Sequence, residues 1–133
     1  MTATLIDTNI FLDLLKGDAW AQWSFRALAE ARSRCRLLIV DVVYSELSVG
    51  FARREDLDAF LADAGPLVQP LSRPALFLAG KAFQTYRKRG GTRTGVLPDF
   101  FIGAHAQVEG LPLLTRDPRH YRTYFPGVEL IAP

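Results

Sequence analysis

Short apolar runs alternate along the chain with longer segments in which apolar residues recur every three or four positions. The run Leu37–Val40 is apolar throughout, as strands buried on both faces of a parallel sheet are. Segment 9–16 has helical spacing, with Ile10 and Leu14 on one face. The predicted strands are 4–6, 37–40, 67–71, 111–115 and 128–131. The predicted helices are 9–16, 18–34, 41–51, 55–64, 72–89 and 98–110, with a short helical or irregular segment over 116–125.

This alternation predicts an α/β fold, a three-layer sandwich with helices on both faces of a parallel sheet. Local signals mark the boundaries of these elements. Gly17 ends the first helix, Asp41 is a candidate N-cap, and Pro74 lies in the first turn of its helix. Pro70 indicates that its strand lies at an edge of the sheet, because proline cannot donate a ladder hydrogen bond.

The composition is that of one globular domain over residues 1–133. A mass of 14.8 kDa suits a single domain, and 49% hydrophobic against 23% charged residues excludes intrinsic disorder. No apolar run approaches the roughly 18 residues of a membrane span, and we expect no secretory signal. Because Cys35 is the single cysteine, it cannot form an internal disulfide. We therefore expect a protein of the reducing cytoplasm, without membrane association.

The net charge of +2 is too small to indicate a nucleic-acid partner by itself. Arginine nevertheless supplies 13 of the 16 basic residues, and a guanidinium binds phosphate through two parallel hydrogen bonds where an ammonium cannot. A GC-rich coding sequence would produce the same bias, so both explanations stay open.

Most of the 14 acidic residues are expected at the surface. Asp13 is three residues from Lys16 on the predicted polar face of the first helix. Asp56, Asp58 and Asp63 belong to a solvated helix. We expect none of these acids to take part in chemistry.

Asp7 and Asp117 each come directly after a predicted strand or within two residues of its end. Ligands of open α/β sheets bind beyond the carboxyl ends of strands, so both residues lie where sites form. The alternative role for either one is to cap the N-terminus of a helix.

Glu46 and Asp99 share helical faces with apolar residues such as Val43 and Ile102. A carboxylate that borders an apolar surface costs several kcal/mol unless a cation or a proton compensates it. An arginine partner is one solution and a divalent cation is the other. Asp99 also lies in the first turn of its helix, where the helix dipole favours an anion.

If these four acids converge, carboxylate-only ligands favour Mg²⁺ or Mn²⁺ over Zn²⁺. No Cys and His set supports zinc, since His105 and His120 are far apart in sequence and Cys35 stands alone. We expect each of these three to be an ordinary core or surface residue.

Four segments resemble the motifs of PIN-domain ribonucleases, in order and over the whole chain. They are Ile6-Asp7-Thr8-Asn9-Ile10-Phe11-Leu12-Asp13-Leu14-Leu15, Ser45-Glu46-Leu47 followed by Gly50, Pro98-Asp99-Phe100-Phe101-Ile102-Gly103-Ala104-His105-Ala106, and Leu114-Thr115-Arg116-Asp117 followed by Tyr121 and Tyr124-Phe125-Pro126. One motif alone would be a weak signal, whereas four in register are specific. The size of the chain is most similar to that of the VapC toxins of VapBC toxin–antitoxin pairs.

The resemblance implies a Mg²⁺- or Mn²⁺-dependent endoribonuclease that acts as a toxin. The acidic quartet of catalytic and metal-binding residues would be Asp7, Glu46, Asp99 and Asp117, and the supporting residues would be Thr8, Asn9 and Thr115. The implied sheet has five parallel strands in the order 3-2-1-4-5, which places the first strand beside the fourth. The implied partners are an RNA substrate, a VapB-like antitoxin and a second copy of the chain, with DNA reached only through the antitoxin.

The densest basic stretch is a helix end followed by a glycine-rich loop. Its cations are Arg87, Lys88, Arg89 and Arg93, and we interpret them as RNA contacts because the loop leads directly to Asp99. A solvated helix end is the alternative. Arg116 begins a second candidate basic patch, beside Asp117.

Aromatic residues on the second and fourth predicted helices include Trp20, Phe25 and Phe60, and we expect most of them in the core. The resemblance adds that such toxins bind an antitoxin segment in a groove near these helices. A receiver-like signalling module phosphorylated on Asp is the alternative function, although Asp7 is followed by Thr8 where a receiver carries a second acid. A catalytically inactive interaction domain is a third hypothesis, which the presence of all four acids disfavours.

Overall fold

The computed structural model describes residues 2–133, and within this span a five-stranded sheet forms the middle layer. Its strands lie in the order β3-β2-β1-β4-β5, and every neighbouring pair is parallel. The fold class predicted from the alternation of elements is confirmed, and so is the strand order that the resemblance implied. The strands are β1 (Ala3–Ile6), β2 (Arg36–Val40), β3 (Leu67–Gln69), β4 (Leu113–Leu114) and β5 (Leu130–Ile131).

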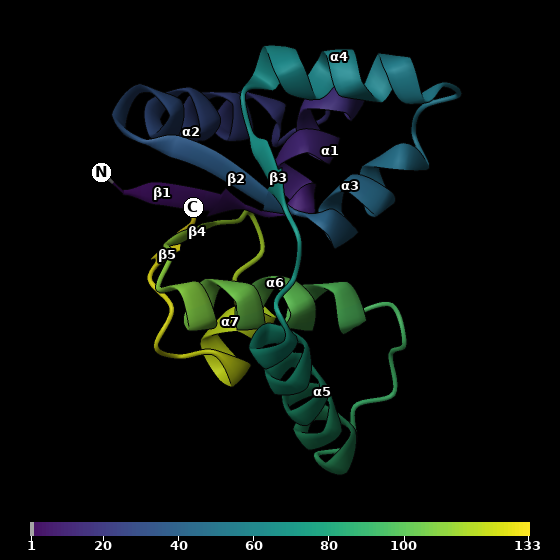
Figure 1. Ribbon diagram of the computed structural model, residues 1–133, viewed down its shortest axis with the longest axis vertical. Helices are drawn as coiled ribbons and strands as arrows, with labels where there is room; N and C mark the ends of the chain where they lie inside the picture. Colours follow the sequence, from purple (N-terminus) through teal and green to yellow (C-terminus); the bar gives the residue numbers. More distant parts are fainter. Residues whose placement is uncertain (1) are drawn as a thin grey trace.

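Helices cover the sheet on both sides (Figure 1). Helices α1, α2 and α4 lie above it in this view, α5, α6 and α7 lie below it, and α3 lies at the right. Their bounds are α1 (Thr8–Lys16), α2 (Ala21–Arg34), α3 (Asp41–Ser48), α4 (Arg54–Ala64), α5 (Arg73–Lys88), α6 (Leu97–Glu109) and α7 (Arg119–Tyr124). Throughout residues 2–133, no helix combines the length and the apolar content needed to cross a bilayer.

Local sequence signals set several of the element ends. Gly17 ends α1 in the left-handed conformation, with φ 63°, which glycine adopts without a steric penalty. Ser72 caps α5 by accepting a hydrogen bond from the Ala75 amide at 3.2 Å. Asp41 is not the predicted N-cap: it is the first residue of α3, and the extended residue Val40 occupies the cap position without a side-chain hydrogen bond.

Strands β4 and β5 are both shorter than predicted, and β4 keeps two residues of the expected 111–115. Its last ladder partner on β1 is Ile6, which pairs with Leu114. The backbone amide of Asp7 then donates to the Leu114 carbonyl at 2.9 Å. The segments that follow β1 and β4 therefore stay aligned beyond the last ladder pair. This alignment brings Asp7 and Thr115 together at the carboxyl edge of the sheet.

The core explains the apolar character of the central strands. Leu5 of β1 and Ile39 of β2 are fully buried between the two helical layers. On α6, Gly103 lies against the ring of Phe125, and a Cβ at this position would overlap that ring. The glycine of the third motif is thus a packing requirement, and it lets α6 approach the segment that follows α7.

The aromatic residues of α2 and its preceding turn correct one expectation. Trp20 is 43% exposed and Phe25 is 62% exposed, so neither belongs to the core. Trp23 and Phe60 are half-buried against it. Packing in the core therefore does not explain the aromatic residues at positions 20 and 25.

Candidate active site

The four predicted acids lie at the edge of the sheet where β1, β2 and β4 end. Asp7 follows β1 and occupies the N-cap of α1, Glu46 is on α3, Asp99 is in the first turn of α6, and Asp117 follows β4. Helix α3 contacts α6, which brings the second and third acids to one place. In Figure 1 this edge lies to the right of the sheet, between α3 and the start of α6.

Asp7 is a buried carboxylate held by neutral donors alone. Its Oδ2 accepts hydrogen bonds from the hydroxyls of Thr115 and Tyr121, both at 2.8 Å, and from Asn9 Nδ2 at 3.4 Å. Burial raises the pKa of Asp7 to about 7, and the negative charge of Asp99 is the second cause. The hydrogen bonds lower this pKa without overcoming burial, because none of the donors carries a charge.

Glu46 is half-buried and accepts a hydrogen bond from the Thr8 hydroxyl, which reaches Oε1 at 2.7 Å. Burial raises the pKa of Glu46, and the charge of Asp99 raises it further. Thr8 is buried at the start of α1, so it ties this helix to α3. The Glu46 carboxylate is therefore partly withdrawn from water, and a neutral hydroxyl orients it.

The carboxylate of Asp99 lies beside His120, whose Nδ1 is 3.3 Å from Oδ2. Burial raises the pKa of Asp99 even though His120 opposes this shift, and the charge of Asp117 adds to the increase. His120 also stacks on the ring of Phe100, so α7 and α6 share this contact. His120 thus lies within the acidic site, whereas we expected an ordinary core or surface residue.

Asp117 differs from the other three acids because a cation already pairs with it. Arg119 donates from Nε at 2.8 Å and from Nη2 at 2.7 Å to the two carboxylate oxygens. These hydrogen bonds hold the pKa of Asp117 below its usual range. Thr115 Oγ1 accepts from the Asp117 amide at 3.1 Å and fixes the backbone there. Asp117 therefore stands at the rim of the site as one half of an ion pair.

The three predicted supporting residues all contact the acids or each other. Thr8 donates to Glu46, and Thr115 donates to Asp7. Asn9 Nδ2 lies 3.3 Å from Thr115 Oγ1, and Asn9 Oδ1 accepts from the Arg116 amide at 3.1 Å. Helix α1 and the segment after β4 are thereby connected through side chains as well as through the sheet.

Sequence reasoning missed Tyr121 as a functional side chain. It is fully buried, and its hydroxyl lies in direct contact with Asp7. Burial holds the pKa of Tyr121 well above its usual value, so the hydroxyl remains a donor. Its place in the fourth motif was visible in the sequence, but a tyrosine four residues after Asp117 carries no signal that it reaches back to β1.

The donor chemistry of this site fits a hard divalent cation. Within residues 2–133, no group of three or more His, Cys, Asp or Glu side chains is placed so that it could hold a metal ion as the side chains stand. Yet Asp7, Glu46 and Asp99 influence one another electrostatically, and the raised pKa values show that their charges are under-compensated. Carboxylates that repel one another in this way are the ligands that Mg²⁺ and Mn²⁺ prefer.

The predicted basic residues divide into two groups. Arg93 lies close enough to lower the pKa of Asp99, and the backbone of Arg116 is bound to the site as described above. The others lie at the end of α5, near the tip of the lower layer in Figure 1. There Arg87 rests on the Phe83 ring and Arg89 on the Tyr124 ring, while Lys88 ends the helix.

Asp13 is the clearest departure from expectation. It is 1% exposed rather than part of a polar surface. Its Oδ2 accepts hydrogen bonds from the Ser24 hydroxyl at 2.6 Å and from Arg116 Nε at 2.8 Å. The sequence spacing is compatible with this burial. Asp13 is three residues after the buried Ile10, which places it on the border of the apolar face of α1.

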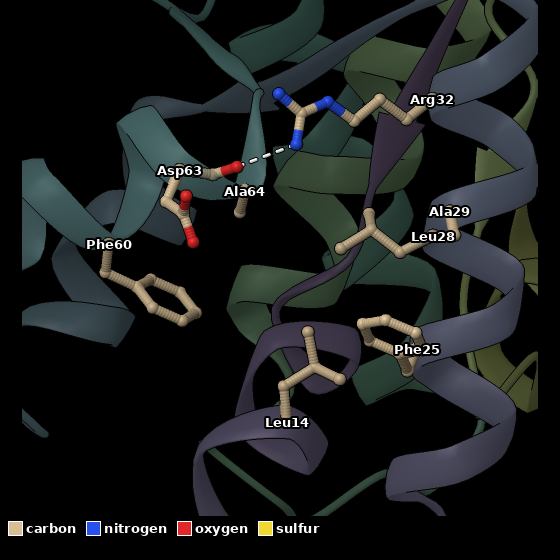
Figure 2. A pocket seen from close by; sticks show the side chains of 8 residues that line it. All are labelled: Leu14, Phe25, Leu28, Ala29, Arg32, Phe60, Asp63 and Ala64. Carbon is tan, nitrogen blue, oxygen red and sulfur yellow. Dashed lines mark hydrogen bonds between the residues drawn. The ribbon is translucent and has the colours of Figure 1, made fainter.

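An apolar groove of about 340 Å³ lies between α1, α2 and α4 (Figure 2). Leu14, Phe25 and Leu28 approach it from α1 and α2, and Phe60 approaches it from α4. Arg32 closes one end by donating from Nη1 to the Asp63 carbonyl at 2.7 Å. The exposed ring of Phe25 is thus part of a groove wall.

The PIN-domain family profile matches residues 4–126 of this chain, and the chain belongs to that family. The match covers every element from β1 to α7, including all four acids. Comparison with curated proteins finds no match.

Solved structures of similar fold come from bacterial toxin–antitoxin complexes. A chain in the crystal structure of VapBC2 from Rickettsia felis, bound to a promoter DNA fragment, is 19% identical, with a TM-score of 0.74 and coverage of 99% of both chains. A chain of VapBC-1 from nontypeable Haemophilus influenzae is 21% identical, with a TM-score of 0.73 and 98% coverage of both. A chain of a toxin–antitoxin complex from Klebsiella pneumoniae is 26% identical, with a TM-score of 0.68 and 94% coverage of both.

Proposed function

We propose that this protein is a Mg²⁺- or Mn²⁺-dependent endoribonuclease and the VapC-like toxin of a toxin–antitoxin pair, acting in the cytoplasm. Membership of the PIN-domain family and the similar toxin–antitoxin structures support the proposal. The observation that carries the proposal is the environment of the Asp7 carboxylate, which is buried and, among residues 2–133, lacks a positively charged partner. A buried carboxylate with neutral partners and two acidic neighbours is an incomplete site that a divalent cation would complete.

Each acid has a distinct part in this proposal. Asp7 and Asp99 would hold the cation, Glu46 would complete its ligands or orient a water molecule, and Asp117 would hold a second metal or bound waters. The cation would lower the pKa of a bound water and offset the charge that develops on the phosphoryl oxygens. Water attack in line with the leaving 3′ oxygen gives a 5′-phosphate and a 3′-hydroxyl.

The residues around the acids would preserve this arrangement. All three hydrogen bonds to Asp7 go to Oδ2, which leaves Oδ1 for another ligand. Partners that orient a metal ligand in this way keep it ready to bind. Arg93 and Arg116 are the predicted cations nearest the acids, and Arg87, Lys88 and Arg89 would extend the RNA-binding surface along α5.

A cleavage assay tests the proposal. The purified chain should cut RNA in the presence of Mg²⁺, stop after chelation, and yield 5′-phosphate ends. Asp99→Asn should reduce cleavage to background, because it removes one of the two principal ligands. Asp58→Asn is the matched control: that acid is exposed and pairs with Arg54 and Tyr44 on the far side of α3, so activity should be unchanged. Undiminished cleavage by Asp99→Asn, or after chelation, contradicts the proposal.

The groove between α1, α2 and α4 supports the proposed antitoxin partner. Its apolar walls, about 340 Å³ in volume, suit a short segment with large apolar side chains. Phe25→Asp should weaken co-purification with a co-expressed cognate antitoxin, whereas Phe77→Asp, at a similarly exposed phenylalanine on α5, should not. Equal retention by both variants contradicts the groove assignment. A homodimer, and contact with DNA only through the antitoxin, complete the proposed assembly.

The receiver-like alternative does not fit this fold. Receivers have the strand order 2-1-3-4-5, whereas β1 lies at the centre of a 3-2-1-4-5 sheet here.

A further inference from the structure

Asp13, Ser24, Arg116 and Trp20 form a network beside the acidic site that the proposed chemistry does not use. Asp13 is buried and binds both Ser24 and Arg116 through Oδ2. The guanidinium of Arg116 lies over the ring of Trp20, 5.8 Å from its centroid. Three segments meet in this way: α1, the start of α2, and the loop after β4.

This network fixes the direction of one cation next to the acids. The backbone amide of Arg116 is bound to Asn9, which also contacts Asp7, and its side chain is bound to Asp13. An arginine whose backbone amide and Nε are both hydrogen-bonded loses little conformational entropy when its guanidinium binds a ligand. Within residues 2–133, its two Nη nitrogens make no hydrogen bond, so their donors remain for a phosphate.

Other ion pairs of the chain lack this anchoring. Arg34 pairs with Glu30 at 2.6 Å, but both side chains are more than 60% exposed, and such pairs are mobile and screened. Arg116 is 29% exposed and Asp13 is 1% exposed. Burying a carboxylate is costly, and this one holds a cation at the rim of the site rather than within the core.

Trp20 adds the second observation. Trp20 is 43% exposed although it lies against Arg116 of the buried ion pair, so the ring does not serve to fill the core. An exposed aromatic ring next to an arginine is a surface on which an unpaired base can stack, and stacking tolerates any base.

We propose that Trp20 and Arg116 together contact a single RNA strand as it enters the acidic site, with Arg116 binding a backbone phosphate and Trp20 stacking on a neighbouring unpaired base. Asp13 is a positioning residue for Arg116. This inference rests on the proposed ribonuclease function and assigns substrate contacts to two residues outside the acidic quartet. The stacking contact needs an unpaired base, because the bases of a duplex are already stacked on one another.

Binding measurements test the proposal without cleavage. The probe is a short fluorescein-labelled single-stranded RNA of mixed sequence, titrated against the chain carrying Asp99→Asn. Arg116→Ala should weaken binding about tenfold and reduce the slope of log affinity against log salt by roughly 0.7, the value for one phosphate contact on a single strand. Trp20→Ala should weaken binding about tenfold without changing that slope, because stacking releases no counterion.

Matched controls separate these effects from general loss of charge or of an aromatic ring. Arg34→Ala removes an arginine at the end of α2, beside the opposite edge of the sheet, and Phe77→Ala removes an exposed ring on α5. Both should bind the RNA as the parent does. A duplex of the same sequence should bind more weakly than the single strand and should be insensitive to Trp20→Ala.

Testing whether Asp13 positions Arg116 requires a quantity that would stay constant if Asp13 only stabilised the fold. The KM for RNA is such a quantity. In the chain with intact Asp99, Asp13→Asn should raise KM for the single strand several-fold with kcat nearly constant, because the carboxamide keeps its hydrogen bonds but fixes Arg116 less firmly. Arg116→Ala leaves Asp13 without its cation, so the doubly substituted chain Asp13→Asn/Arg116→Ala serves as the folded reference. Its KM should match that of Arg116→Ala.

The outcomes distinguish this inference from the proposed function. If the parent cuts RNA and Arg116→Ala binds within twofold of Arg34→Ala with an equal salt slope, the RNA contact is wrong and the ribonuclease stands. If Asp13→Asn lowers the melting temperature but leaves KM unchanged, its positioning role is wrong. If the parent never cuts RNA yet the binding differences appear, the nuclease is wrong and the contact stands.

Discussion

Two buried acids, one capping helix α1 and one within it, are held in opposite ways. Asp7 at the N-terminus is 4% exposed and accepts hydrogen bonds from hydroxyl and amide groups only. Asp13, one and a half turns later, is 1% exposed and binds a guanidinium as well as a hydroxyl. Burial alone therefore does not distinguish a site acid from a structural one.

The difference lies in the charge of the partners. Neutral donors fix the direction of the Asp7 carboxylate but leave its negative charge uncompensated, and its pKa rises to about 7. Arg116 compensates Asp13 directly. An acid that is oriented but not neutralised remains available to a cation from solution, whereas an acid that already has a guanidinium directs that guanidinium instead.

The largest expected effect comes from replacing the uncompensated acid. Asp7→Asn keeps an oxygen for the Thr115 and Tyr121 hydroxyls, so we expect the fold to persist. RNA cleavage should fall to background, more than the ~10–100-fold loss typical of residues that only orient a metal ligand. Circular dichroism checks the fold and a gel assay checks cleavage. Full activity in a folded variant would remove Asp7 from the site.

The second effect is a pH dependence of stability in the metal-free protein. The pKa of Asp7 is about 7 in the folded state against 3.8 for the unfolded chain, so the folded state binds the extra proton between these values. Stability should be highest near pH 4 and fall as pH rises through about 7. The loss is on the order of 4 kcal/mol at 1.36 kcal/mol per pKa unit.

The difference between the parent and Asp7→Asn measures this contribution together with the electrostatic coupling of Asp7 to Glu46 and Asp99. Burial lowers the pKa of His105, which acts in the opposite sense near its ordinary value of 6.5, but it does so equally in both proteins. Denaturant unfolding in chelator from pH 5 to 8 should show the decline in the parent and a flatter profile in the variant. Parallel profiles would mean that Asp7 has no raised pKa.

The third expected effect concerns Asp13, whose charge is compensated by Arg116. Arg116→Ala should destabilise the protein by about 1–3 kcal/mol, because Asp13 keeps its burial and loses its cation. In the Asp13→Asn background the same substitution should cost much less, and a double-mutant cycle from denaturant unfolding measures the coupling. Equal costs in both backgrounds would show that the pair contributes nothing to stability.

The smallest expected effect comes from one neutral donor. Tyr121→Phe deletes a hydroxyl that contacts Asp7, so it should cost about 1 kcal/mol of stability and raise the pKa of Asp7 further. The Mg²⁺ concentration that supports half-maximal cleavage should increase about tenfold. Thr123→Ala, at an exposed hydroxyl on the same helix, is the control. An unchanged Mg²⁺ requirement would make Tyr121 a packing residue.

Much of the fold could be predicted from the sequence because its signals are local. The apolar run at Leu37–Val40, the stop at Gly17 and the helix start marked by Pro74 each act within a few residues and are found where expected. The strand order came from the resemblance, not from these signals. Strands β4 and β5 were predicted too long, because their ends depend on partners rather than on composition.

The sequence by itself placed Asp7 and Asp117 after strands and Glu46 and Asp99 on helices beside apolar residues, because these positions follow from periodicity along the chain. It placed Asp13 on a polar face, which the structure corrects. Tertiary structure alone decided what surrounds each of them. Arg116 reaches Asp13 across 103 residues and Tyr121 reaches Asp7 across 114, through the pairing of β1 with β4. The free energy of a buried charge depends on the groups that folding brings to it, and no local pattern of residues encodes those neighbours.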